Sequence, residues 1–223
     1  NSDIPYDSIY RPKGFFSSDH AQMIFNLDNN KTYGPYSDGE FLKYSKMIDK
    51  KRNGNVRASH ILVSYQGAQG ASAEITRTKE DARKEASRIL NLARINPDSF
   101  SSYALEFSDG PSKSNGGDLG FFQEGMMVKP FNDYVFSNTA GRIGLVETDF
   151  GFHVIKVVAK EDVVLVGTIG LKNIPSDRTS DSIFNIASKF EIELGKSIDI
   201  NKTAADLDFE VKSLNSIGEL DHD

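Results

Sequence analysis

The residues best suited to hold a ligand lie between Asp109 and Phe131, in the stretch DGPSKSNGGDLGFFQEGMMVKPF. Its first half is a polar loop whose glycines permit positive φ and close backbone approach, so the loop can turn sharply into a short strand. Its second half is apolar, with side chains at Phe121, Phe122, Met126, Met127 and Phe131. Such a series predicts a shallow pocket shaped for a small apolar ring.

Two histidines lie in segments that read as strands, His60 in SHIL (59–62) and His153 in TDFGFHVIKV (148–157). A single histidine on a strand is usually a hydrogen-bonded core residue. The chain's four histidines show no metal-ligand spacing, and its carboxylates form no EF-hand pattern. A serine hydrolase would need a nucleophile elbow, which the sequence lacks. The sequence therefore predicts no metal site and no hydrolase, and no cofactor.

Taken in order, these three stretches resemble the parvulin family of peptidyl-prolyl cis/trans isomerases over about residues 56 to 160. The resemblance implies that His60 and His153 face each other in a hydrogen-bond network that reaches Thr148 and an acidic or cysteine position. It also implies an apolar cradle in which Leu119, Met127 and Phe131 hold the substrate's proline ring. Phe150 stands where the family often has a small polar residue and is expected to close the side of the pocket, and Phe122 is expected to contact the substrate as well.

The expected acid of this network is the point at which the chain departs from the family. Counted without gaps from GGDLG, the position often occupied by cysteine or aspartate is Gly110, and Asp109 stands immediately before it. A shift of one residue in the loop would bring Asp109 into the site as a fourth catalytic residue. Without that shift the network has no acid. The alternative to an isomerase is then a parvulin-fold chaperone or peptide-binding module with little or no isomerase activity.

The expected substrate is an unfolded or nascent polypeptide with an unmodified X-Pro bond. Family members directed to phosphoproteins carry basic residues soon after the first motif, whereas residues 64–73, SYQGAQGASA, contain none. A phosphoserine would lack a guanidinium or ammonium partner there. The chain as a whole most resembles extracytoplasmic foldases of the SurA, PrsA and PpiD kind, particularly PpiD-like proteins of bacteroidetes, which implies a periplasmic or otherwise extracytoplasmic location.

Composition is compatible with this interpretation. The net charge of −6 and the absence of a Lys/Arg cluster argue against a nucleic-acid partner. The absence of cysteine excludes disulfides and thiolate chemistry. No apolar run reaches the roughly 18 residues that span a bilayer, so a membrane anchor is expected only outside this sequence.

The elements that must position these residues predict an α+β fold, a small and largely antiparallel sheet flanked by helices. Strands are expected at 56–65, 119–122, 144–147 and 152–158, and a further strand at VVLVGTIGL, 163–171. Amphipathic helices are expected after Thr78, after Pro97, at 130–137 and at 180–194. A last short strand is expected at 209–214.

Three segments are predicted along the chain. Asn53, Gly54 and Asn55 form a polar break, so residues 53–161 are expected to be the isomerase domain. Residues 1–52 read as a helix and a hairpin, and resemble the C-terminal half of a degenerate parvulin-like unit in which Lys43 stands at the position of His153. The alternative is a helix and hairpin that merely brace the next domain. Residues 162–223 are expected to begin a C-terminal α/β segment.

Overall fold

The computed structural model describes residues 2–197, 199–206, 208 and 211. It divides into two compact units, Asn1–Leu171 and Lys172–Asp223. The first contains all the predicted site residues. The strand predicted at 209–214 lies outside the described residues except for Val211.

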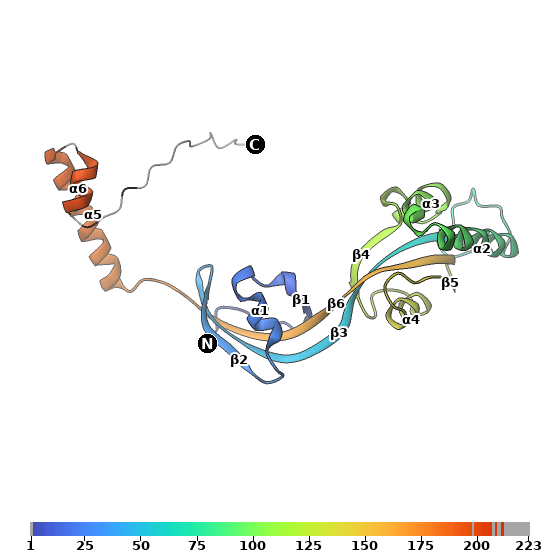
Figure 1. The fold of residues 1–223 in the computed structure, drawn as a ribbon, viewed down its shortest axis with the longest axis horizontal. Helices are drawn as coiled ribbons and strands as arrows, with labels where there is room; N and C mark the ends of the chain where they lie inside the picture. The colour runs from blue at the N-terminus through green and yellow to red at the C-terminus, as the bar shows by residue number, and fades with distance from the viewer. Residues whose placement is uncertain (1, 198, 207, 209–210, 212–223) are drawn as a thin grey trace. The chain divides into compact units, whose positions relative to one another are not determined.

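One six-stranded sheet organises the first unit, with the order β1-β6-β3-β2 and with β4 paired to β3 and β5 paired to β6. Its strands are β1 (Arg11–Pro12), β2 (Thr32–Asp38), β3 (Phe41–Val63), β4 (Asp118–Gln123), β5 (Ile143–Thr148) and β6 (Gly151–Lys172). Figure 1 shows β3 and β6 running side by side. Side-chain contacts such as Ser45 with Thr168 and Asn55 with Glu161 show that these two strands run in opposite directions.

Helices cover the sheet where the sequence predicts amphipathic stripes. They are α1 (Ser18–Asn26), α2 (Lys79–Ile95), α3 (Phe100–Phe107) and α4 (Lys129–Ser137), with short 3-10 turns at Lys13–Phe15, Pro97–Ser99 and Pro111–Asn115. Thr78 caps α2, because its hydroxyl accepts a hydrogen bond from Asp81 N–H at 3.2 Å. The predicted α+β class with an antiparallel sheet is confirmed.

Two apolar cores form on the end of the β3–β6 pair that carries the histidines. In one, the buried faces of α2 and α3, including Ala86, Ile89 and Ala104, pack on Ile61 and Val154. In the other, Phe131 and Val135 of α4 pack on Val56, Ile155 and Val157. Because alternate strand residues point to opposite faces, each strand supplies both cores. The site therefore rests on strands held from both sides.

The opposite end of the β3–β6 pair repeats part of this arrangement. Helix α1 and helix α4 each span nine residues, and each leads into a two-stranded hairpin. The two buried residues of α1, Ala21 and Ile24, fall at the same positions as Asn132 and Val135 of α4, which also buries Phe131. This order supports the degenerate half-unit predicted for residues 1–52, which stays a prediction.

The boundaries predicted at 52/53 and 161/162 fall inside strands β3 and β6. Asn53 takes a positive φ of 52° without ending the strand, because Asn tolerates this backbone region. Its N–H donates to the Asp162 carboxylate at 2.8 Å, so the polar residues of the two strands satisfy each other. The strand predicted at 163–171 is consequently the continuation of β6 rather than a separate element.

The second unit contains α5 (Asp177–Ser197) and α6 (Ile200–Asp206). Thr203 and Ala204 of α6 are buried. Between the helices lies an apolar depression of about 520 Å³, lined by residues that include Ile183, Phe190 and Ile200. The predicted helix at 180–194 is confirmed as the middle of α5.

Candidate functional site

The structure brings His60 of β3 and His153 of β6 into direct contact. Their Nδ1 atoms are 3.0 Å apart, and the rings are nearly parallel, with an interplanar angle of 14°. His60 is 8% exposed and His153 is 5% exposed. Because the two strands are neighbours, residues 93 positions apart in sequence become hydrogen-bond partners.

Thr148 extends this contact from the end of β5. Its hydroxyl oxygen lies 2.8 Å from His153 Nε2 and accepts a hydrogen bond from Phe150 N–H at 3.1 Å. The turn that follows requires a glycine at Gly151, since φ there is +132° and a Cβ would contact the backbone carbonyl of Val63. Gly151 thus lets the β5–β6 hairpin approach β3 closely enough to place Thr148 beside the histidines.

The hydrogen bonds from Thr148 through His153 to His60 can be ordered so that each group donates to the next. Thr148 already accepts from Phe150, so its own hydroxyl proton is free to donate to His153 Nε2. A neutral His153 then carries its proton on Nδ1 and donates it to His60 Nδ1. His60 in turn carries its proton on Nε2. In this order the Nε2–H of His60 is a hydrogen-bond donor at the end of the series.

Both imidazoles are held in the neutral form. Burial lowers the pKa of His60 to about 4. Burial, together with the neighbouring His60, lowers the pKa of His153 to about 3. A charged imidazole would have to give up its hydration here without a carboxylate partner, which is the costlier state. The pair therefore supplies fixed dipoles at neutral pH rather than a positive charge.

Phe131 joins the imidazoles to the apolar cradle. Its ring meets His60 and His153 edge-on, with centroids 5.7 and 5.6 Å away. Leu119 and Met127 are partly buried and pack against the cluster that contains Phe131. Phe131 itself is 3% exposed, and the cradle that these three residues are expected to form stays a prediction.

Phe122 takes a different place from the one expected. It is 3% exposed and packs on Phe131 with the ring centroids 6.3 Å apart. Its partners Val56 and Val135 belong to the same buried core. Phe122 therefore supports Phe131 from within the core instead of lining a surface for substrate.

A depression of about 290 Å³ opens beside Thr148 and Phe150. Tyr65, Val128 and Pro130 supply its apolar walls. Lys79 and Glu147 also line it and pair with each other at 2.6 Å. Phe150 lines this depression, and its expected role in closing the substrate pocket stays a prediction.

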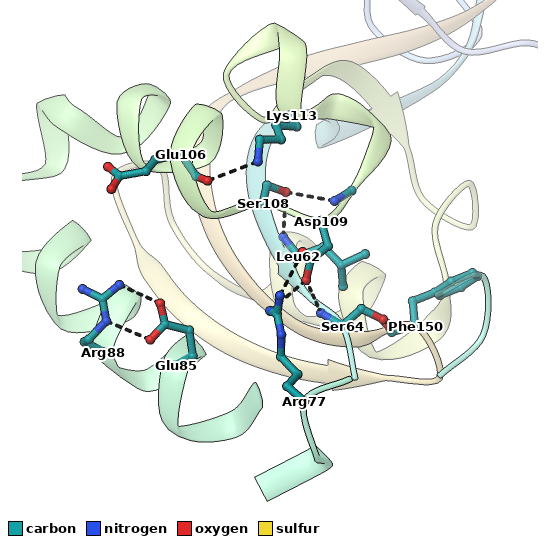
Figure 2. Close-up of polar contacts among 11 residues, drawn as sticks. Leu62, Ser64, Arg77, Glu85, Arg88, Glu106, Ser108, Asp109, Lys113 and Phe150 are labelled. Carbon is teal, nitrogen blue, oxygen red and sulfur yellow. Dashed lines mark hydrogen bonds and ion pairs between the residues drawn. The ribbon is translucent and has the colours of Figure 1, made fainter. Parts of the chain in front are cut away.

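The hydrogen bonds of the Asp109 carboxylate go to Ser64 and Arg77 and not to either histidine. One of its carboxylate oxygens accepts hydrogen bonds from Ser64 N–H at 2.9 Å and from Arg77 Nη1 at 3.0 Å, and the other accepts from Arg77 Nη2 at 3.3 Å (Figure 2). The residue that faces the site is Gly110, where a Cβ would lie 3.7 Å from His60 Cε1. The alternative in which Asp109 supplies the acid of the imidazole network is therefore corrected. The position that the ungapped count gave, Gly110, lies beside His60 and has no side chain.

Ser64 and Arg77 are functional candidates that the sequence did not reveal. Ser64 is buried, and its hydroxyl donates to the Phe150 carbonyl oxygen at 2.9 Å. Arg77 lies 32 residues before Asp109 and just before the Thr78 cap. Neither belongs to a motif, and only the fold shows that both reach one carboxylate.

Within the described residues, no group of three or more His, Asp or Glu side chains is arranged to hold a metal ion. Across the same part of the chain, no helix is both long enough and apolar enough to cross a bilayer.

Comparison with known proteins places the site in a family. The family model of the PPIC-type PPIase domain matches residues 42–161, which is more than half of the 223-residue chain. A peptidyl-prolyl cis-trans isomerase named pin1 from Rhizopus delemar is 36% identical over 158 residues, which cover 69% of this chain and 97% of that protein.

This chain covers different shares of two further relatives. The pin1 isomerase of Schizosaccharomyces pombe is 41% identical over 106 residues, or 45% of this chain and 61% of that protein. The foldase protein PrsA of Geobacillus sp. (strain WCH70) is 36% identical over 128 residues, or 56% of this chain and 38% of that foldase. The chain therefore spans less than two thirds of both proteins.

Proposed function

Because this chain belongs to the PPIC-type, or parvulin, family of peptidyl-prolyl cis/trans isomerases, we propose that it rotates X-Pro bonds in unfolded, non-phosphorylated polypeptides outside the cytoplasm. The observation that carries this proposal is the hydrogen-bond chain from Thr148 through His153 to His60, with Phe131 against both imidazoles. The residues that act on substrate in this proposal are His60, His153, Thr148, Leu119, Met127, Phe131 and Phe150, with Phe122 behind Phe131, and all lie within the predicted isomerase domain, 53–161.

Rotation about an X-Pro bond requires no covalent chemistry from the protein. Rotation about the amide meets a barrier of about 18–20 kcal/mol because the planar peptide bond is stabilised by resonance. The twisted amide has lost that resonance and separates less charge, so an apolar, water-poor site stabilises it relative to the planar ground state. Each 1.36 kcal/mol gained in this way accelerates rotation about tenfold. No bond is broken and no cofactor is needed.

The residues divide this work between an apolar and a polar side. Met127 and Leu119 hold the edges of the proline ring above Phe131, and Phe150 bounds the depression beside it. The neutral imidazoles keep the polar side fixed without placing a charge there. The carbonyl of the residue before proline can swing between these two sides while the ring stays clamped.

The charges around the depression support an unmodified substrate. Arg77 and Lys79 are the nearest basic residues after the first motif, and each is already paired, Arg77 with Asp109 and Lys79 with Glu147. A phosphoserine before the proline would need to displace one of these carboxylates.

The proposed extracytoplasmic location is supported by similarity to a foldase and by composition. The Geobacillus relative is named a foldase, PrsA, and the absence of cysteine suits an oxidising compartment such as the periplasm. We propose that the clients are unfolded or nascent chains that emerge in that compartment, and that the protein also holds them as a chaperone.

The second candidate is a binding module that grips proline-containing segments without accelerating rotation. The observation that favours it is Gly110, which leaves the position beside His60 without a carboxylate or a thiol. The same cradle would then bind the proline ring without accelerating rotation of the peptide bond.

A proline tetrapeptide distinguishes the two. If the chain is an isomerase, cis-to-trans exchange accelerates with protein concentration and falls when Met127→Ala removes one side of the cradle. Met126→Ala is the matched control, since Met126 is 68% exposed and outside the cradle. Exchange at the rate of buffer, with peptide binding retained, would select the binding module.

A further inference from the structure

The loop between β3 and α2, residues 64–77, borders the depression and has few apolar anchors of its own. Gly67 and Gly70 have positive φ, and much of the loop is exposed. It touches the site at the β5–β6 turn, where Gln69 N–H donates to the Asp149 carbonyl at 2.9 Å and Gly70 lies against the Phe150 ring. The position of the loop therefore sets the width of the depression at Phe150.

One carboxylate holds both ends of this loop. Asp109 accepts from Ser64 N–H, where the loop begins, and from the Arg77 guanidinium, where it ends. Figure 2 shows the Asp109 carboxylate between these two residues. Gln66 N–H adds a bond to the Arg77 carbonyl at 3.0 Å, so the ends of the loop are also joined through the backbone.

Asp109 is connected to the site in two directions, through its carboxylate and through its backbone N–H. Ser64 continues from Asp109 to the Phe150 carbonyl through its hydroxyl. In the other direction, Asp109 N–H donates to the Leu62 carbonyl at 2.8 Å, which fixes the backbone just before Gly110 and so its approach to His60. Asp109 thus lies between the loop, the side of the depression and the imidazole pair without touching a ligand.

The environment makes this pair stronger than an ordinary surface pair. The Arg77 and Asp109 side chains are 34% and 19% exposed, and the guanidinium engages both carboxylate oxygens. Charge-assisted, two-point hydrogen bonds of this kind resist solvent competition better than single exposed contacts. The Ser64 N–H beneath them has no access to water, because Ser64 is 2% exposed.

We propose that Asp109 is a positioning residue, which clamps the ends of the 64–77 loop and thereby sets the affinity of the site for X-Pro peptides. This rests on the proposed function, since the affected ligand is the isomerase substrate. The clamp explains how an acid next to the expected catalytic position contributes without belonging to the imidazole chain. Asp109 needs Arg77 as its partner at the end of the loop. Ser64 connects Asp109 to Phe150, because the Ser64 hydroxyl donates to the Phe150 carbonyl oxygen.

The test separates substrate affinity from turnover in the full chain. Asp109→Asn keeps an acceptor for Ser64 N–H but loses the charge, and Arg77→Gln removes the guanidinium. We expect each to raise KM for a proline tetrapeptide by about five- to tenfold, with kcat within about twofold of the parent, as measured by exchange NMR at several peptide concentrations. The double variant should be no worse than either single variant, because both remove one interaction.

Arg88→Gln provides the matched control. Arg88 also donates two hydrogen bonds to a carboxylate, that of Glu85, but both partners lie within α2 (Figure 2). The control variant should leave KM unchanged, and Arg77→Lys should recover part of the affinity. Amide hydrogen exchange in residues 65–76 should accelerate in Asp109→Asn and Arg77→Gln and stay unchanged in Arg88→Gln.

The outcomes are distinguishable. Unchanged KM and unchanged loop exchange in Asp109→Asn and Arg77→Gln would overturn the clamp, and so would a fall in kcat at constant KM, which would make Asp109 part of the catalysis. If the parent protein does not accelerate cis-to-trans exchange of the tetrapeptide, the proposed isomerase function fails. The clamp is then decided by loop exchange and by the dissociation constant for the same tetrapeptide, which must rise in the two variants.

Discussion

His60 Nδ1 lies 3.0 Å from His153 Nδ1, and the two imidazoles are stacked nearly in parallel within the protein. A contact between two ring nitrogens at this distance holds one proton, so one ring donates and the other accepts. Protonating both nitrogens would set two like charges against each other in a site that water hardly reaches. The folded state and the hydrogen bonds of the site therefore both require that the two imidazoles be neutral.

Stability should fall as pH drops below 6.5. Both histidines have depressed pKa values when folded, near 4 and 3, whereas in the unfolded chain they titrate near 6.5. The unfolded chain thus binds more protons over this window, so protonation favours unfolding. The contribution of the neutral imidazoles to the free energy of unfolding is fully present above about pH 6.5 and declines as pH falls through 4 and 3. We expect the free energy of unfolding in urea to be about 4 kcal/mol lower at pH 5 than at pH 7.

His153→Asn provides the control for this prediction, because it removes one titrating ring and keeps a polar side chain. The decrease between pH 7 and pH 5 should then be about half as large, roughly 2 kcal/mol. A decrease of the same size in parent and variant would show that other groups cause it.

Thr148→Val should damage both stability and turnover. The substitution keeps the shape of the side chain but removes the hydroxyl that joins His153 Nε2 and Phe150 N–H. Two buried polar groups lose a partner, which we expect to cost about 1–3 kcal/mol in denaturant unfolding. With the proton order of the imidazoles no longer fixed, kcat should fall about tenfold. Thr148→Ser restores the hydroxyl and should recover most of the rate; wild-type kcat in Thr148→Val would contradict this role.

The sequence predicted the elements around the site because their signals are local. The apolar stripe and the Thr78 cap define α2, and alternation and turn residues define the β5–β6 hairpin. The contact of His60 with His153 could be expected only through resemblance to a family, because nothing within either strand specifies its partner across the sheet.

The expectations that failed depend on contacts between distant residues. Asn53 reads as a break, yet the Asp162 carboxylate from β6 satisfies its N–H and the strand continues. Asp109 reads as a catalytic acid, but its direction is decided by Arg77 and Ser64. Phe122 and Met127 are similarly apolar in sequence, and only packing shows that Phe122 belongs to the core.

Phosphorylation before the proline should not improve a substrate. Arg77 and Lys79 are both paired with carboxylates, and Glu147, which lines the depression, would repel a phosphate that enters it. We expect kcat/KM for a phosphoserine-proline peptide to be no higher than that for its alanine-proline counterpart. The measurement compares the two peptides at one ionic strength, and a serine-proline peptide controls for side-chain size. A preference of about tenfold or more for the phosphopeptide would contradict this assignment.

Gly110 offers the most direct way to alter the site. Its backbone, with φ −83° and ψ 161°, suits any L-residue. A Cβ there would lie 3.3 Å from Leu62 Cβ, so a small local adjustment suffices. Gly110→Asp places a carboxylate close to His60, and an opposite charge stabilises the protonated imidazole. The pKa of His60 should therefore rise from about 4 toward neutrality.

The kinetic consequence of Gly110→Asp should be a faster isomerase whose rate depends on pH. The added carboxylate supplies the acid that the hydrogen-bond chain from Thr148 to His60 lacks, so kcat should rise, and a titration should appear in its pH profile between about pH 5 and 7, where the parent shows none. Gly110→Asn adds nearly the same volume without charge and should leave the profile flat. If Asn accelerates the reaction as much as Asp, the effect comes from filling space beside His60. If neither variant changes kcat, position 110 does not limit catalysis.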